Sequence, residues 1–398
     1  MIVSLLDTDL YKFSQQQFVL ELYPNTQVTY KFKNRGSQRF NWQFLDQLNK
    51  AIKDMELLYL THEEYEWLKI NCPYLKPMYL EYLRNYRFNS DEVKTSLDKE
   101  NNLELTISGP WHSTILWEVP LLATISELYF KIVETKWADT GMPAIDAIQK
   151  SRAIKKAMTL ENNNCKYMEF GTRRRRSYHI QDLVVEMFKN TSVDKAEYGT
   201  TSFMGTSNVH LAKKHGLKAI GTFSHESVSA VAILESINHA NRYMMKNWQK
   251  VYGNQLGIAL TDTFGTDAFL KDFDYELASS YAGTRHDSFC PFVYTNKILA
   301  HYKKLKIDPR TKDIIFSDSL TTDKVVEINN FCREKINCYF GVGTHFSNHF
   351  DDSPALNIVI KLDSVNNIPS VKLSDVEGKE TGDPEMVKIY KKIYNIGE

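Results

Sequence analysis

Between residues 165 and 345, short apolar segments alternate with helical stretches, and this alternation constrains the fold more than any other feature of the sequence. The apolar segments are KYMEFG, TSFMG, LKAIG, LGIALTD, DIIFSD and INCYFGVG, and each ends in a polar, glycine-rich loop. Most of these loops lead into helical stretches such as SNVHLAKKHG and TTDKVVEINNFCREK. Strands that alternate with helices form βαβ units, so we predict a parallel sheet.

The polar loops recur near residues 171, 205, 225, 262, 287, 318 and 343. Their spacing of roughly 20 to 37 residues is typical of one βα unit. Seven such units favour a closed or nearly closed barrel, whose active site lies at the C-terminal ends of the strands. An open, doubly wound sheet is the structural alternative.

The chain on either side of this region has a different pattern. Residues 1–135 contain the strand-like segments QVTYKFK and LELTIS, helical spacing over 40–70, and a long apolar helix in WEVPLLATISELYFKIVETKW. The last 50 residues contain IVIKLDSV and PSVKLSD, which read as strands outside the alternating pattern. We therefore predict an N-terminal α/β domain over 1–135, the barrel over 136–348, and a C-terminal segment over 349–398 that packs back on the N-terminal domain.

Composition excludes several classes of protein. The 49 basic and 49 acidic residues give zero net charge, which offers no general argument for binding nucleic acid or membranes. No run of about 18 apolar residues is present, and the N-terminus lacks the basic start of a signal peptide. The five cysteines are an odd number without C-x-x-C spacing, which argues against a disulfide framework or structural zinc. We expect a cytoplasmic protein.

Basic residues follow the first strand of the alternating region. EFGT is followed by the run Arg173–Arg176, and four successive arginines usually form a solvated basic face or a nucleic-acid patch. Here they come directly after a strand, where guanidinium groups can grip phosphate or carboxylate. We therefore predict an anion site, with Arg173 its strongest member. A nucleic-acid role is disfavoured by the zero net charge and the lack of an aromatic stacking motif.

GTFSHE at 221–226 is the sharpest local feature. His225 follows a strand and lies in the first turn of a helix, where the helix dipole disfavours the cationic imidazole. Most isolated histidines are structural or merely exposed. This one is placed to act as a neutral nucleophile, and the helix N-terminus would stabilise a phosphoryl group on it.

Later strand ends carry further polar groups. GTRHDS places Arg285 and Asp287 together, FSDS places Asp318 at the end of a strand, and GVGT provides Gly343 and Thr344 near the last strand, where barrels commonly bind phosphate. A surface ion pair is the alternative interpretation of GTRHDS. GTSN at 205–208 is a weaker anion site at a helix N-terminus.

The motifs of common enzyme classes are missing: no Walker sequence, G-x-G-x-x-G, G-x-S-x-G or H-E-x-x-H occurs. What remains is a ring of Arg, His, Asp, Ser and Thr at strand ends, which suits an anionic sugar-phosphate substrate.

In order, the segments LLDTDLYKFSQQQ, VTYKFKNRG, WEVPLLATISELYF, EFGTRR, GTSN, GTFSHE, LTDTFGTDAF, GTRHDS and GVGTHFSN resemble nicotinate phosphoribosyltransferases over nearly the whole chain. The resemblance implies an irregular α/β barrel with an N-terminal α/β domain, acting as a homodimer with shared active sites. It also implies that nicotinate and 5-phosphoribosyl 1-pyrophosphate react to nicotinate mononucleotide and pyrophosphate, with ATP as co-substrate and Mg²⁺ as cofactor.

Site residues follow from the same resemblance, position by position. His225 corresponds to a transiently phosphorylated histidine, with Asp287 beside it in catalysis. The base contacts are expected at Tyr11, Arg173, Ser207, Thr222 and Arg285, with Tyr11 acting on the neighbouring subunit's site. The phosphoribosyl pyrophosphate contacts are expected at Arg174, Asp287, Asp318, Gly343 and Thr344, and no metal ligand is assigned.

Ser207 bears on the choice of substrate. The related nicotinamide enzymes resemble G-T-D-T and use a carboxylate at this position, which accepts from an amide. A serine hydroxyl instead can donate to a carboxylate, so we expect nicotinate rather than nicotinamide. The alternatives are a nicotinamide enzyme, a quinolinate enzyme, disfavoured by the order of the motifs, and a nucleotide-binding paralogue without catalysis.

Overall fold

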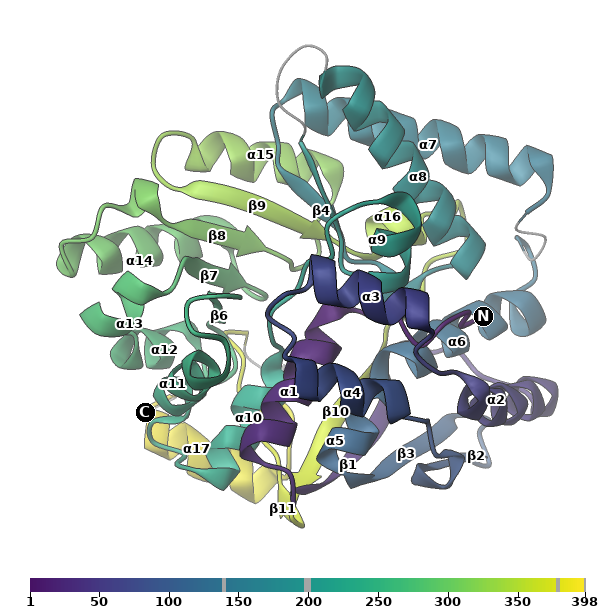
Figure 1. Ribbon diagram of the computed structural model, residues 1–398, viewed down its shortest axis with the longest axis horizontal. Helices are drawn as coiled ribbons and strands as arrows, with labels where there is room; N and C mark the ends of the chain where they lie inside the picture. The colour runs from purple at the N-terminus through teal and green to yellow at the C-terminus, as the bar shows by residue number, and fades with distance from the viewer. Residues whose placement is uncertain (138–140, 197–201, 377–379, 397–398) are drawn as a thin grey trace.

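The computed structural model describes residues 1–137, 141–196, 202–376 and 380–396. Its central element is a six-stranded sheet in the order β5 (Phe203–Thr206), β4 (Tyr167–Glu169), β9 (Asn337–Val342), β8 (Asp313–Phe316), β7 (Gly283–His286) and β6 (Ile258–Leu260). Every pairing between neighbours is parallel, which confirms the sheet type predicted from the alternating pattern. Figure 1 shows α14 (Pro291–Lys304) and α15 (Thr322–Cys332) on the outer side of these strands.

The order of the strands describes most of a ring. β4 pairs with β5, β6 to β9 pair in succession, and β9 returns to pair with β4, so β5 and β6 are the two edge strands. The segment LKAIG, predicted as a strand, forms one parallel bridge, from Thr206 to Ala219. Among the described residues, no pairing joins this segment to β6. The hydrogen bonds therefore show a parallel α/β sheet, while closure of the barrel stays a prediction.

A second, antiparallel sheet joins the two ends of the chain. Its order is β11 (Ile368–Pro369), β10 (Ile358–Val365), β1 (Gln27–Asn34), β3 (Leu103–Pro110) and β2 (Val93–Leu97). β1 and β10 pair from Val28 opposite Val365 to Asn34 opposite Ile358. Because β10 pairs with β1, the segment after β11 returns toward the parallel strands, and Lys372 in this segment contacts His225.

Helix α1 (Leu10–Leu22) lies near the centre of the molecule (Figure 1). It buries polar as well as apolar side chains, including Lys12, Gln15, Gln16 and Gln17. Polar side chains are stable at such positions only when hydrogen-bonded, and all four have partners. α6 (Glu118–Leu128) is almost wholly buried and begins before Pro120, as expected for proline in the first turn.

The remaining helices surround these elements. They are α2 (Trp42–Asp54), α3 (His62–Asn71), α4 (Pro77–Asn85), α5 (Trp111–Thr114), α7 (Pro143–Asn162), α8 (Tyr178–Ala196), α9 (Val209–His215), α10 (His225–Leu234), α11 (Ala240–Tyr252), α12 (Thr266–Asp272), α13 (Tyr275–Ser280), α16 (Thr344–Ser347) and α17 (Pro384–Tyr394). Short helical turns are η1 (Met55–Leu57), η2 (Ser90–Glu92), η3 (Ile115–Trp117), η4 (Tyr129–Val133), η5 (Thr172–Arg174) and η6 (Pro309–Thr311). No helix in the described ranges is long and apolar enough to cross a membrane.

The N-terminus of α9 corrects one expectation. Asn208 caps the helix by accepting from Leu211 N, and Gly216 ends it with φ 64°. The first two amides, of Val209 and His210, donate to carbonyls near the start of the chain. All three N–H groups of this turn are thus occupied, so the predicted anion site at GTSN is wrong.

Candidate functional site

The ends of the parallel strands carry most of the predicted site residues. Arg173 follows β4, His225 begins α10, and Arg285 and Asp287 lie at the end of β7. Arg285 lies inside β7, and Asp287 directly follows the strand. The carboxyl ends of parallel strands meet at one edge, so these residues converge although they lie far apart in the chain.

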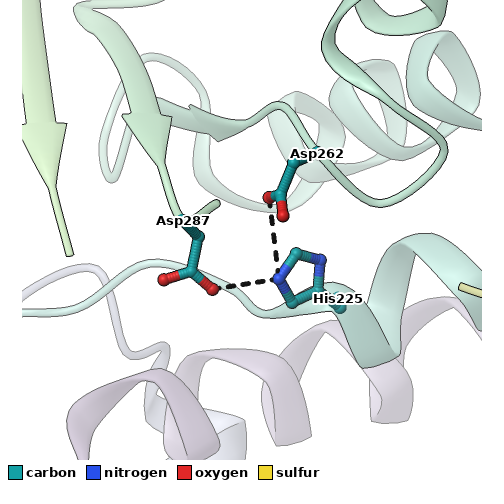
Figure 2. Close-up of side chains that lie close together, drawn as sticks. All are labelled: His225, Asp262 and Asp287. Atoms are coloured by element: carbon teal, nitrogen blue, oxygen red, sulfur yellow. Dashed lines mark hydrogen bonds and ion pairs between the residues drawn. The ribbon is translucent and has the colours of Figure 1, made fainter. Parts of the chain in front are cut away.

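His225 is the centre of a group that we call the histidine cluster (His225, Asp262, Asp287 and Lys372). Its Nδ1 lies 3.0 Å from Thr263 Oγ1, and its Nε2 lies 3.0 Å from Asp287 Oδ2 and 3.6 Å from Asp262 Oδ1. Figure 2 shows the two carboxylates reaching the same ring nitrogen from different loops. Lys372 Nζ lies 2.9 Å from this nitrogen.

The cluster favours a neutral imidazole. Burial lowers the pKa of His225, the Lys372 ammonium lowers it further, and the two carboxylates oppose both effects. Nε2 faces both an acceptor, the Asp287 carboxylate, and a donor, the Lys372 ammonium, so the ring proton has two places: on Nε2 it is donated to Asp287, and on Nδ1 it is donated to Thr263 and leaves the Nε2 lone pair facing Lys372. The group can therefore act as a nucleophile through Nε2.

Both carboxylates of the cluster are ionised. Burial opposes this, but His225 and Arg285 hold the pKa of Asp287 well below its usual range. The His225 imidazole, when protonated, and the Lys372 ammonium hold the pKa of Asp262 below its ordinary value against burial. Ser317 Oγ donates to Asp287 at 2.7 Å and Ser288 Oγ donates to Asp262 at 2.8 Å, which fixes one oxygen of each.

The histidine cluster also has the composition of a cation site. Three possible ligand atoms, one each from His225, Asp262 and Asp287, lie within 4.8 Å of one another. Asp262 Oδ1 is buried and has no hydrogen-bond partner among the described residues. A buried, unpaired carboxylate oxygen is costly, so this atom is suited to a cation that accompanies a substrate.

Tyr11, Glu118 and Arg173 form a neighbouring group, the arginine cluster. Tyr11 OH donates to Glu118 Oε2 at 3.1 Å, and Arg173 Nη1 lies 3.4 Å from Glu118 Oε1. Arg173 is 48% exposed and close enough to Asp287 for their charges to interact. Tyr11 therefore lies beside Arg173 of its own chain, and its action on a neighbouring subunit's site stays a prediction.

Arg285 has a donor without an acceptor. Its Nη1 donates to Phe223 O at 3.1 Å, while its buried Nε has no partner within the described part of the chain. A guanidinium with a free donor is suited to an anionic ligand such as a carboxylate.

Ser207 does not lie as the sequence argument requires. Its hydroxyl donates to Asp9 Oδ1 at 2.7 Å, and Asp9 is buried. A hydroxyl has one proton to donate, so Ser207 cannot at the same time donate to a ligand's carboxylate. The proposed role of Ser207 as donor to the acid group is therefore wrong for this arrangement.

The other predicted residues are less closely tied to the cluster. Arg174 Nε donates to Ile358 O, and Asp318 accepts from Ser319. Gly343 precedes α16 and Thr344 begins it, both half-buried. Thr222 O accepts from Ser14 Oγ in α1, which anchors the loop that leads to His225.

The last two arginines of the run are structural. Arg175 forms a fully buried pair with Asp7, at 2.7 Å. Arg176 lies over the rings of Phe130 and Phe350. Both guanidinium groups are buried, so neither forms a basic surface.

Three residues of the site were missed by the sequence argument. The loop near residue 262 was recognised, but Asp262 was given no role. Lys372 lies 147 positions from His225, and Glu118 lies in an apolar helix, where one acidic residue attracts little notice. Only Asp262 had a local signal, because it ends a predicted strand.

Comparisons with known proteins agree along the whole chain. Residues 165–398 match the family described as the nicotinate phosphoribosyltransferase (NAPRTase) family, and residues 6–126 match its N-terminal domain. A nicotinate phosphoribosyltransferase of Methanosarcina acetivorans is 46% identical over 401 residues, covering 98% of this chain and 97% of the relative. The crystal structure of the enzyme from Porphyromonas gingivalis has a TM-score of 0.93 at 35% identity, with both chains covered completely. That from Vibrio cholerae has a TM-score of 0.91 at 32% identity, covering 100% of this chain and 95% of the other.

Proposed function

Because the chain belongs to the nicotinate phosphoribosyltransferase family, we propose that it joins nicotinate to 5-phosphoribosyl 1-pyrophosphate, coupled to ATP through a phosphohistidine at His225. The enzyme serves nicotinate salvage toward NAD, and neither the nicotinamide enzyme nor the silent paralogue is favoured. The observation that carries the coupling is the neutral His225, whose Nε2 faces Lys372 at 2.9 Å.

We assign the acid group of the base to two guanidinium groups. Arg285 has a buried Nε without a partner in the described residues, and Arg173 is half-exposed with one carboxylate at 3.4 Å. Tyr11 shares Glu118 with Arg173, and Thr222 precedes Phe223, whose carbonyl accepts from Arg285. Since Ser207 donates to Asp9, the preference for acid over amide rests on the two arginines rather than on the serine. An amide carries no charge for a guanidinium to pair with.

The ribose phosphate and pyrophosphate are assigned to the neighbouring strand ends. Gly343 and Thr344 follow the last strand, where barrels commonly bind phosphate. Arg174 is the basic group next to the base site, and Asp287 and Asp318 are the carboxylates that face the ribose and the pyrophosphate.

The transfer itself needs no general base. The pyridine nitrogen has a free lone pair, so it forms the bond to C1 of the ribose as the bond from C1 to the pyrophosphate oxygen breaks. The transition state is loose and cation-like, so the protein's task is to position the base and stabilise the leaving charge. Arginines and backbone N–H groups at the strand ends suit this task.

Asp262 and Asp287 are the residues that would hold Mg²⁺. This ion prefers oxygen ligands and usually combines one or two carboxylates with substrate phosphates. The unpartnered Asp262 Oδ1 fits this requirement within the described part of the chain. When bound, the ion neutralises charge on the pyrophosphate.

ATP phosphorylates His225. The bond from Nε2 to the γ-phosphorus forms as the bond from that phosphorus to the β,γ-bridging oxygen breaks, and ADP leaves. Lys372 lies where it can stabilise the transferred group. Water later cleaves the nitrogen–phosphorus bond, and this hydrolysis drives an otherwise weakly favourable synthesis.

We further propose a homodimer with shared active sites, acting in the cytoplasm. The family resemblance supports the dimer. The five cysteines, all free, suit a reducing compartment.

A product assay tests the proposal. Phosphoribosyl pyrophosphate and Mg²⁺ are supplied with nicotinate or nicotinamide, each with and without ATP. We expect nicotinate mononucleotide as the main product, raised by ATP, and a preference for nicotinamide would overturn the assignment. In His225→Ala, ATP stimulation should vanish while slow transfer remains. Complete loss of transfer with unchanged ATP hydrolysis would reject the role of His225.

A further inference from the structure

Lys12 is a buried cation for which the proposed reaction has no direct use. Its side chain is 0% exposed, and its Nζ lies 2.6 Å from Glu118 Oε2 and 2.6 Å from Glu226 Oε2. A lysine buried without partners would lose its charge. Although burial opposes it, the two carboxylates raise the pKa of Lys12, so the ammonium stays charged.

The Glu226 end of this arrangement is fixed. Glu226 follows His225 in the first turn of α10 and accepts from Tyr30 OH at 2.5 Å and from Trp111 Nε1 at 2.7 Å, in addition to Lys12. These donors hold the carboxylate in the core. Glu226 therefore anchors the lysine.

The Glu118 end faces the arginine cluster. One oxygen of Glu118 receives Lys12 and Tyr11, and the other faces Arg173 at 3.4 Å. Burial would raise the pKa of Glu118, but Lys12 and Arg173 lower it, so the carboxylate is ionised. Arg173 remains 48% exposed, with donors available for a ligand.

We propose that Glu118, held by Lys12, is a positioning residue that orients Tyr11 and Arg173 toward the acid group of nicotinate. This inference rests on the proposed function, because it takes these two residues as contacts of the base. Glu118 touches neither the base nor the reacting atoms. The 3.4 Å contact engages only Nη1 of the half-exposed guanidinium, so Glu118 directs Arg173 while the other donors remain available for a ligand.

Glu118→Gln tests this role with little risk to folding. It removes one charge and leaves Lys12 paired with Glu226 at 2.6 Å. The new amide presents N–H groups or a weaker acceptor to Tyr11, Lys12 and Arg173. We expect the KM for nicotinate to rise about tenfold, equivalent to about 1.4 kcal/mol. The KM for phosphoribosyl pyrophosphate should change less than about twofold, because the phosphate contacts lie elsewhere.

Glu92→Gln is the matched control. Glu92 is similarly buried and accepts from Ser113 Oγ and Trp117 Nε1, neither of which belongs to the arginine cluster. Its replacement should leave both KM values unchanged. Glu118→Asp, which keeps the charge and shortens the side chain, should give a smaller rise. It also provides the test if the glutamine variant does not fold.

The outcomes separate this inference from the proposed function. If Arg173→Ala leaves the KM for nicotinate unchanged, the assignment of the base contacts fails. If Arg173→Ala raises it and a folded Glu118 variant does not, the positioning role alone is overturned. A lower KM in Glu118→Gln would mean that the carboxylate repels nicotinate, and would also overturn it. An equal rise for both substrates would indicate a general structural role and reject the proposal.

Discussion

Replacing Arg285 with lysine keeps the positive charge but removes the planar fork of donors, and we expect this change to weaken nicotinate binding selectively. Nη1 of Arg285 donates to Phe223 O at 3.1 Å and its buried Nε has no partner in the described residues, so the guanidinium keeps donors for a carboxylate. A hydrogen bond to a charged group contributes about 1.5–3 kcal/mol. Loss of one such bond should raise the KM for nicotinate about 10- to 150-fold.

The assay is initial-rate kinetics at saturating phosphoribosyl pyrophosphate and ATP, with nicotinate varied. Arg242→Lys is the matched control, since Arg242 pairs with Asp274 and Glu276 on a partly exposed surface. That variant should keep the wild-type KM. The reasoning about the free Nε is refuted if Arg285→Lys folds and keeps a KM for nicotinate within twofold of wild type.

Three further perturbations address stability and pH. Asp7→Asn leaves the buried Arg175 without its counter-charge. The free energy of unfolding measured in urea should therefore fall by about 3 kcal/mol. A loss below about 1 kcal/mol would contradict a buried ion pair. Because the pKa of His225 lies below its ordinary value of 6.5, ATP-stimulated activity should persist at pH 6, where an ordinary histidine is about three-quarters protonated. The same shift affects stability, because His225 has its ordinary pKa in the unfolded chain and a lower pKa in the folded one. As the pH falls, the unfolded chain is therefore protonated at a higher pH than the folded chain, and the stability that neutral His225 contributes above pH 6.5 is lost. Lys372→Met removes a cation that lowers this pKa, so the acid limb of the pH–rate profile should move to higher pH, and an unmoved limb would exclude the contact.

Local pattern was sufficient for much of the fold. Alternating apolar segments and helices predicted the parallel sheet, because each βα unit carries its own periodicity. The strand at Gln27–Asn34 was likewise predicted from a few neighbouring residues. The segment LKAIG was predicted as a strand, but its backbone forms only the single bridge at Ala219 and no continuous pairing.

The site was predicted only where one loop carries the signal. Short motifs next to predicted strand ends contain His225, Arg285 and Asp287. The structure brings these three residues together. Lys372 reaches the same histidine from the C-terminal segment, which no local pattern indicates.

The error over Ser207 has a similar origin. Residue type predicted a free hydroxyl, whereas Asp9, 198 positions away, occupies its proton. Pairing between distant polar groups is decided by tertiary packing, so residue type alone does not reveal which donors remain free.

The most direct test of the central claim, that His225 carries a phosphoryl group in an ATP-coupled transferase, is to measure label transferred from γ-³²P-ATP to the protein. We predict an acid-labile, alkali-stable label on the wild-type chain that maps to His225 and is discharged when nicotinate and phosphoribosyl pyrophosphate are added. Absence of label in the wild type, or undiminished label in His225→Ala, would contradict the account.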